Sequence, residues 1–275
     1  MSKQNRTVEI LKNASRNSYG VLAAIVYNVE YITAYVRAAE SRRSPLIILF
    51  FPSTLKQLPS LVYAARAAAD LASVPISVHV DHAQDVEQIR QIATELPVDS
   101  IMIDMSHYEE EENLAKTKTL GALCHGNGKA IEAESGRIEG GEDGIADTAE
   151  LEDVENFLAA DIDILAPSIG NIHGDYGHRG PQLDLERLRQ IRQQINGRVE
   201  IALHGTNDFT PQLMKECIAA GATKINVNKL LLEVWNVHLF RNVNKPLSQL
   251  IEDGIEILQK EVEHWMDIVG SSGKA

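Results

Sequence analysis

The stretch Ile76-Ser77-Val78-His79-Val80-Asp81-His82 is a short, strand-like apolar run that ends in a histidine. Two later runs have the same form. Ile162-Asp163-Ile164-Leu165-Ala166-Pro167 leads to His173, and Val199-Glu200-Ile201-Ala202-Leu203 leads directly to His204. A barrel brings the ends of strands that are far apart in sequence to one common rim. The three runs therefore predict a barrel that gathers three imidazoles at that rim.

Eight strand-like runs of this kind alternate with segments of helical character. The predicted strands are residues 21–27, 45–51, 75–80, 100–104, 129–134, 162–166, 200–203 and 222–227. Most of them do not alternate between apolar and polar residues, which is typical of parallel strands that are buried on both faces. The pattern predicts a (β/α)8 TIM barrel. An open, doubly wound sheet is the alternative, but no Gly-x-Gly-x-x-Gly turn follows the first strand.

Helical patterns also flank the predicted barrel. Residues 8–14 are predicted to close its bottom, and residues 229–275 are predicted to form a C-terminal helical extension of a single domain that spans residues 1–275. The extension has apolar residues at roughly helical spacing: Trp235, Leu239, Leu250, Ile255, Leu258, Val262, Trp265 and Ile268. This stripe predicts a homodimer or homotetramer. The alternative is that it covers the barrel's own helices.

The composition excludes several classes of partner. A net charge of −13 argues against nucleic acid. No apolar run reaches the ~18 residues of a membrane span, so we expect no membrane contact. The first residues are not followed by the apolar stretch of a secretory signal. The two cysteines, Cys124 and Cys217, form no disulfide framework. We therefore expect a cytoplasmic protein that acts on a small molecule.

The three strand-end histidines have a specific chemical meaning. Three protein ligands with an open fourth position are typical of a catalytic zinc rather than a structural one. His82, His173 and His204 are therefore predicted to bind Zn²⁺ in a metal-dependent enzyme. The other histidines that we interpret as structural are His79, His125, His238 and His264.

Polar and ionisable residues end other predicted strands as well, where a barrel places its active site. Six segments, taken together and in order, resemble the class II, zinc-dependent fructose-bisphosphate and tagatose-bisphosphate aldolases. These segments are residues 78–82, 100–107, 131–138, 170–174, 203–205 and 224–227. The resemblance extends from about Val21 to Val227.

The resemblance implies roles for individual residues. His82, His173 and His204 match the zinc ligands, and Asp104 and Glu134 match residues around an alternative metal position. A monovalent cation is a second cofactor that the resemblance allows.

The resemblance also implies an acid–base pair. Asp81 matches the aspartate that hands a proton to the aldehyde oxygen. Glu142 matches a loop glutamate that moves the proton at the ketose carbon, and its alternative interpretation is a solvated loop charge. The glycines at 140, 141 and 144 suit a loop that closes over the site. The substrate is expected to be a small carbohydrate. The residues predicted to bind it are Asn28, Gly174, Gly205, Asn226, Asn228, Lys229 and Arg179.

The sequence departs from the family pattern where the family holds phosphate. His204-Gly205-Thr206-Asn207-Asp208 replaces His-Gly-Gly-Ser-Gly, and Phe51 replaces a serine. Losing glycines and adding a carboxylate weakens an anion site. Lys229 and Arg179 either rebuild a different anion site or are ordinary solvated charges.

The sequence thus predicts a zinc-dependent aldolase that reversibly cleaves a ketose (bis)phosphate or a related hydroxy-carbonyl compound. The alternative is a non-catalytic or regulatory paralogue that retains the barrel and the metal site.

Overall fold

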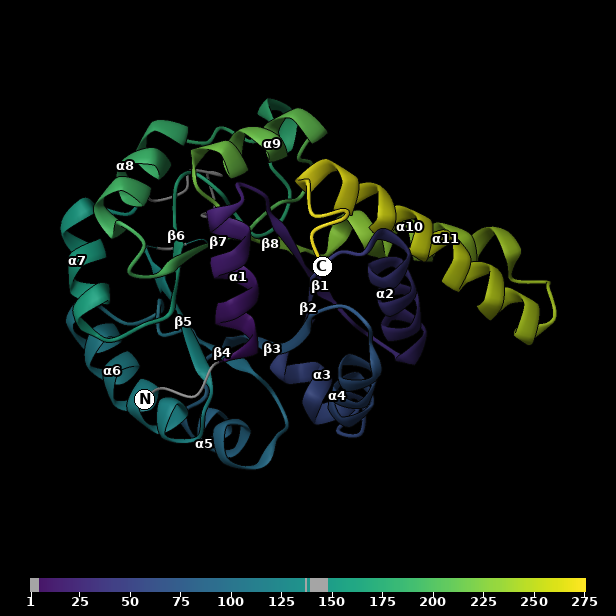
Figure 1. The fold of residues 1–275 in the computed structure, drawn as a ribbon, viewed down its shortest axis with the longest axis horizontal. Coiled ribbons are helices and arrows are strands. Elements are labelled where there is room, and N and C mark those ends of the chain that lie inside the picture. Colours follow the sequence, from purple (N-terminus) through teal and green to yellow (C-terminus); the bar gives the residue numbers. More distant parts are fainter. Residues whose placement is uncertain (1–4, 137, 139–147) are drawn as a thin grey trace.

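Eight parallel strands close into a barrel in the computed structural model, which describes residues 5–136, 138 and 148–275 (Figure 1). The strands follow chain order around the barrel, and β8 pairs with β1. They are β1 (Val21–Ile25), β2 (Leu46–Phe50), β3 (Ile76–Ala83), β4 (Ser100–Ile103), β5 (Ala130–Ser135), β6 (Ile164–Pro167), β7 (Glu200–Leu203) and β8 (Lys224–Val227). The predicted (β/α)8 barrel with extra C-terminal helices is confirmed.

The strands have continuous apolar runs because both of their faces are buried. In β2, Ile47 and Leu49 belong to the cluster inside the barrel, whereas Ile48 and Phe50 belong to the larger cluster that includes the surrounding helices. All four are fully buried. Successive side chains of a strand point to opposite faces, so a strand such as β2, which is buried on both, lacks the alternation of a half-exposed sheet.

Helices surround the barrel (Figure 1). They are α1 (Arg6–Arg16), α2 (Val29–Arg42), α3 (Pro52–Gln57), α4 (Leu61–Leu71), α5 (Val86–Glu95), α6 (Glu110–Gly126), α7 (Leu151–Ala159), α8 (Leu185–Ile195), α9 (Pro211–Ala220), α10 (Lys229–Asn242) and α11 (Leu247–Val269). A short 3₁₀ helix, η1, spans Gly177–Arg179. The sequence patterns do not predict α3, which begins with a proline at its first position. Within the described residues, no helix combines the length and the apolar character needed to cross a bilayer.

Helix α1 closes the bottom of the barrel. Its Leu11 is fully buried in the interior cluster, and Thr7 Oγ1 lies 2.8 Å from Ser100 Oγ at the start of β4. The Arg6 guanidinium donates to the carbonyl oxygen of Ile76, at the start of β3, over 3.0 Å. The opposite rim, where the strands end, therefore remains available for a site.

The C-terminal helices α10 and α11 pack against each other, and α11 also packs along α2. Trp235, Leu258, Val262 and Trp265 are buried in the main core. The apolar stripe of residues 235–268 thus largely covers the chain's own helices rather than a neighbouring subunit. The expectation that this stripe forms a subunit interface is therefore not supported by these residues.

Candidate functional site

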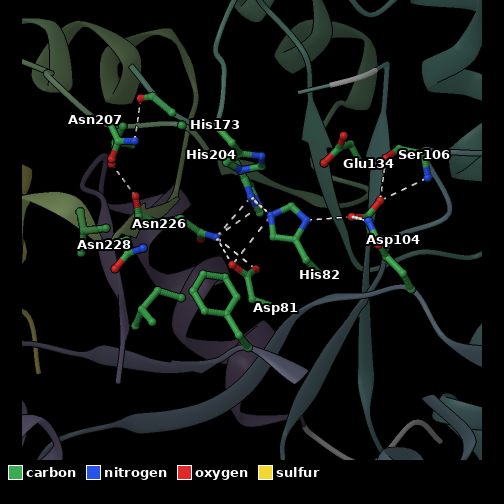
Figure 2. Close-up of a pocket in the computed structure, with 17 residues that line it drawn as sticks. Asp81, His82, Asp104, Ser106, Glu134, His173, His204, Asn207, Asn226 and Asn228 are labelled. Atoms are coloured by element: carbon green, nitrogen blue, oxygen red, sulfur yellow. Dashed lines mark hydrogen bonds and ion pairs between the residues drawn. The ribbon is translucent and has the colours of Figure 1, made fainter. Parts of the chain in front are cut away.

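A cavity of about 410 Å³ opens at the rim formed by the carboxyl ends of the strands (Figure 2). Its size is typical of a small-molecule site. The residues that line it are Ile25, Phe51, Asp81, His82, Gln84, Asp104, Ser106, Glu134, His173, Gly174, His204, Gly205, Thr206, Asn207, Asn226, Val227 and Asn228. The barrel places the ends of distant strands at one rim, and this explains why residues 25 and 228 meet here.

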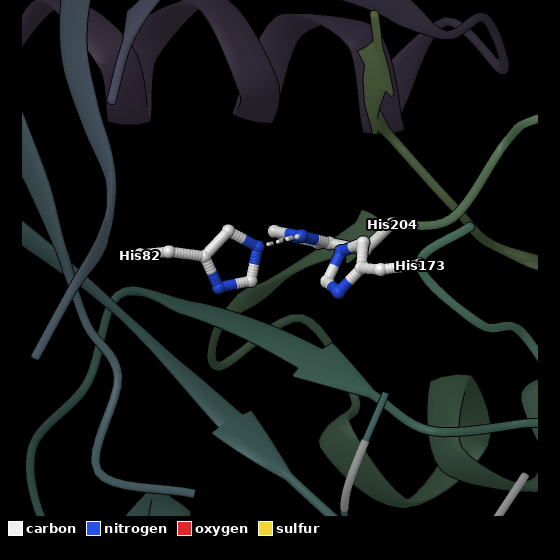
Figure 3. Close-up of side chains that lie close together, drawn as sticks. All are labelled: His82, His173 and His204. Carbon is white, nitrogen blue, oxygen red and sulfur yellow. Dashed lines mark hydrogen bonds between the residues drawn. The ribbon is translucent and has the colours of Figure 1, made fainter. Parts of the chain in front are cut away.

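The three predicted histidines converge in this cavity (Figure 3). His82 lies near the end of β3, His173 follows β6, and His204 directly follows β7. His82 has a left-handed backbone with φ of +48°, and the pairing register of β3 with β4 shifts between Val80 and Ala83. Such a conformation is uncommon outside glycine and gathers at functional sites. The imidazole of His82, on this unusual backbone, points toward the other two histidines.

The geometry of the three imidazoles fits a zinc ion. Each offers a nitrogen, and the three nitrogens lie within 4.8 Å of one another. His82 Nε2 and His204 Nδ1 are 3.1 Å apart. A tetrahedral zinc with bonds of about 2.1 Å sets its ligand nitrogens about 3.4 Å apart. The donor set therefore suits a zinc ion, and the 3.1 Å between His82 and His204 is close to this spacing.

Carboxylates hold the outward-facing nitrogens of two of these rings. Asp104 Oδ2 lies 2.9 Å from His82 Nδ1, and Glu132 Oε1 lies 2.7 Å from His204 Nε2. Metal-binding histidines usually have such a partner, which fixes the orientation and the tautomer of the ring. Asp104 also accepts hydrogen bonds from Gln84 and Ser106.

A second group of possible ligands, formed by His82, Asp104 and Glu134, shares one histidine with the first. Glu134 is buried, and among the residues that the structure describes its Oε2 has no hydrogen-bond partner. Burial raises the pKa of Glu134 to about 8, and the nearby Asp104 carboxylate acts in the same direction. An unpaired buried oxygen beside two other donors is what a second ligand position requires.

The charge of the histidine trio is unevenly distributed. Burial alone would lower the pKa of His82, but Asp81, Asp104 and Glu134 outweigh it and raise that pKa to about 9. Burial lowers the pKa of His204 well below its usual range. Desolvation and the positive charge of His82 lower the pKa of His173 to about 4. Of the three rings, His82 is therefore the one whose pKa the neighbouring carboxylates raise.

Asp81 lies beside the histidines and is almost completely buried. Both of its oxygens accept from the Asn226 amide, over 3.1 and 3.0 Å. Asn226 belongs to β8 and itself lines the cavity. The amide therefore holds the Asp81 carboxylate at the edge of the cavity (Figure 2).

Four of the predicted substrate-binding residues line the cavity: Gly174, Gly205, Asn226 and Asn228. At Gly205, φ is +65°, and an added Cβ would lie 2.4 Å from the carbonyl oxygen of Ile172. Only glycine allows the loop after β7 to approach the loop after β6 so closely. Asn228 accepts a hydrogen bond from the Tyr27 hydroxyl over 2.7 Å.

The other three predicted substrate-binding residues lie outside the cavity lining. Asn28 caps α2, where its side chain accepts from the backbone N–H of Tyr31 over 3.1 Å. Lys229 pairs with Asp208 over 3.2 Å. Arg179 is exposed on η1. Glu142 and the neighbouring loop glycines lie outside the described residues.

Three residues at the positions that depart from the family pattern line the cavity. Phe51, Thr206 and Asn207 are all part of its wall. Thr206 Oγ1 donates to the carbonyl oxygen of Asn226 over 2.6 Å, and Asn207 Nδ2 donates to that of Gly174 over 2.8 Å. Within the described part of the chain, no lysine or arginine lines the cavity.

Three polar residues that support the site were assigned no role from the sequence: Gln84, Glu132 and Lys224. Glu132 and Lys224 are fully buried inside the barrel. Each stands two positions before another site residue, Glu134 and Asn226, so each pair shares one face of a strand. A charged residue at such a spacing in a buried strand is the signal that could have identified them.

Comparisons with known proteins identify the family and the fold that this chain resembles. The model of the family "Fructose-bisphosphate aldolase class-II" matches residues 5–274. A protein of Coccidioides immitis named "Putative fructose-bisphosphate aldolase" is 45% identical, over 99% of this chain and 96% of its own. A "Fructose-bisphosphate aldolase" of Streptococcus pneumoniae is 31% identical, over 97% and 98%. The crystal structure of the YdjI aldolase from Escherichia coli K12 matches with a TM-score of 0.89 and 27% identity, over 98% of both chains.

Proposed function

Because the chain belongs to the family of class II fructose-bisphosphate aldolases, we propose that it uses zinc to cleave a ketose or a related hydroxy-carbonyl substrate by a reversible aldol reaction. The observation that carries this proposal is the meeting of three imidazoles and the Asp81 carboxylate in one cavity. Each comes from a different region of the chain, except for the adjacent pair Asp81 and His82.

His82, His173 and His204 would hold the zinc ion, and Asp104 and Glu134 would offer an alternative position for it. A bound zinc acts as a Lewis acid that stabilises the negative charge developing on the substrate's oxygens. Asp104 and Glu132 orient two of the rings through their outward-facing nitrogens.

The proton transfers are assigned to two carboxylates. When the bond between C3 and C4 breaks, Asp81 takes the proton from the C4 hydroxyl, which becomes the aldehyde oxygen. In the reverse direction, Asp81 returns that proton. Glu142 exchanges the proton at C3 of the ketose fragment. The Asn226 amide keeps Asp81 oriented by two hydrogen bonds.

A retro-aldol assay tests this function. Purified enzyme loaded with zinc is incubated with a panel of phosphorylated and non-phosphorylated ketoses, and aldehyde release is measured with and without a chelator. We expect cleavage of at least one ketose, with loss of activity in the chelator. A zinc-loaded protein that cleaves none of them would favour a non-catalytic paralogue.

Within the same panel, we expect weak or no cleavage of fructose 1,6-bisphosphate. The described cavity lining has no lysine or arginine, Lys229 is paired with Asp208, and Phe51 occupies a wall position. The Phe51→Ser/Asp208→Gly variant is expected to cleave this bisphosphate faster than the wild type. A wild-type kcat/KM of about 10⁴ M⁻¹s⁻¹ or above, in the ordinary enzyme range, would contradict the expectation.

We also expect a homodimer or homotetramer. Val237, Phe240, Val243 and Leu247 are exposed around the turn between α10 and α11, and Phe240 is 86% exposed. This apolar surface favours self-association. Light scattering at micromolar concentration should give a multiple of 30.3 kDa, and Phe240→Glu should lower it. The matched control is Leu71→Glu, at an equally exposed position on α4. A wild-type mass near 30.3 kDa would refute the prediction.

A further inference from the structure

A lysine lies fully buried inside the barrel, below the histidine trio. Lys224 is the first residue of β8, and its Nζ is 2.9 Å from Glu132 Oε2 and 2.8 Å from Asn226 Oδ1. A buried ammonium is costly unless it is paired and hydrogen-bonded. However, an apolar pair of similar volume is often as stable as a buried ion pair. Stability alone therefore does not explain why charges stand here.

The first consequence of this lysine concerns Asp81. An ammonium group only donates hydrogen bonds, so the Asn226 atom that faces Lys224 is the oxygen. The amide nitrogen of Asn226 then points the other way, toward Asp81, and donates to both carboxylate oxygens. Lys224 thus favours the orientation of Asn226 in which its amide nitrogen meets Asp81.

The second consequence concerns His204. Lys224 Nζ also lies 3.2 Å from Glu132 Oε1, the same oxygen that is 2.7 Å from His204 Nε2. Because a carboxylate paired with an ammonium only accepts hydrogen bonds, His204 Nε2 carries the hydrogen. The lone pair of His204 is then on Nδ1, the atom that lies 3.1 Å from His82 Nε2.

We propose that Lys224 is a positioning residue. It sets the direction of the hydrogen bonds that run through Glu132 to His204 and through Asn226 to Asp81. Through Glu132 it turns the unprotonated Nδ1 of His204 toward the metal position, and through Asn226 it keeps Asp81 as an acceptor at the cavity edge. Lys224 does not line the cavity, so it acts through these two neighbours and through its own ion pair with Asp81, whose Oδ1 lies 3.8 Å from Nζ. The inference rests on the proposed function in assuming that the histidine trio holds a metal.

Zinc affinity tests the proposal without relying on turnover. It is measured by competition with a chromogenic chelator in the wild type and in Lys224→Met. Loss of such an outer partner typically costs about 10- to 100-fold in metal affinity, and we expect a decrease of that size. The absorption spectrum of the Co²⁺-substituted protein should also change. Equal affinity and an unchanged Co²⁺ spectrum in a folded Lys224→Met variant would overturn the proposal.

The matched control is Lys129→Met. Lys129 is partly buried, and its Nζ donates to the carbonyl oxygens of Leu96 and Val98. It lies just before β5, near the bottom of the barrel, away from the cavity. Lys129→Met is therefore expected to retain the zinc affinity and the Co²⁺ spectrum of the wild type.

A second variant separates positioning from folding, because Lys224→Met leaves a buried carboxylate unpaired. The double variant Lys224→Met/Glu132→Gln removes both charges and should recover thermal stability. An amide can present either a donor or an acceptor to His204, so the double variant should still bind zinc more weakly. Recovery of wild-type affinity together with stability would show that the pair serves folding alone.

The wild-type protein provides a further measurement that needs no substitution. In the zinc-loaded protein with ¹⁵N-labelled histidine, NMR should show hydrogen on His204 Nε2 and metal on Nδ1. The opposite assignment would overturn the role of Lys224. A wild-type protein that binds no zinc would instead refute the proposed function, so the two failures are distinguishable.

Discussion

The His204→Ala variant is expected to lose its bound zinc and, with it, measurable aldol cleavage. His204 is buried, and its Nδ1 lies 3.1 Å from His82 Nε2. Removing it leaves two imidazoles, too few for the three protein ligands of a catalytic zinc. Metal analysis of the purified protein measures the loss. We expect a decrease in His82→Ala and His173→Ala as well.

A fourth histidine at the same rim provides the control. His107 follows β4 and is exposed, with its ring 4.1 Å from that of Tyr108, and it belongs to none of the possible ligand groups in the described residues. His107→Ala should retain a full complement of zinc. Undiminished zinc in all three variants of the trio would rule out this metal site.

The Asp81→Ala variant is expected to keep the fold and the zinc but to lose about 10²- to 10⁴-fold in turnover, the usual effect of removing an acid–base group. Asp81 is held by two hydrogen bonds from Asn226 and lies next to His82 in sequence. Turnover is measured on the substrate that the ketose panel identifies, and circular dichroism and metal analysis are carried out on the same samples.

Asp175→Ala is a suitable comparison for Asp81→Ala. Asp175 follows His173 in the same loop, is exposed, and does not line the cavity. Its variant should turn over substrate at close to the wild-type rate. If Asp81→Ala also retained wild-type turnover, the proton-transfer role of Asp81 would be wrong.

The sequence predicted the barrel because burial on both faces of a strand leaves a local pattern. β7 lies between Glu200 and Leu203 as predicted, and the other strands overlap their predicted ranges. Bounds differ at strand ends, as at β3, which continues to Ala83 rather than ending at Val80. There the backbone of His82 has a positive φ and the register shifts, which a local apolar pattern does not reveal.

The meeting of the three histidines was also predictable, because a barrel leaves few places for the ends of its strands. The residue type at a single position was a weaker guide to the role of its side chain. Asn28 matches a family residue, yet its side chain caps α2. Lys229 is a cation near the rim, yet it pairs with Asp208. Short polar side chains and surface cations have several partners within reach, and the sequence does not rank them.

By itself, the sequence determined the eight strands, the helices between them other than α3, and the rim at which the imidazoles gather, since each follows from local periodicity and from strand order. The tertiary structure alone decided the partners inside the barrel. Lys224 and Glu132 are 92 residues apart, and they meet because the strands are staggered by a particular register as the barrel closes. Register depends on packing around the whole barrel, so no local stretch of sequence specifies which buried charge faces which.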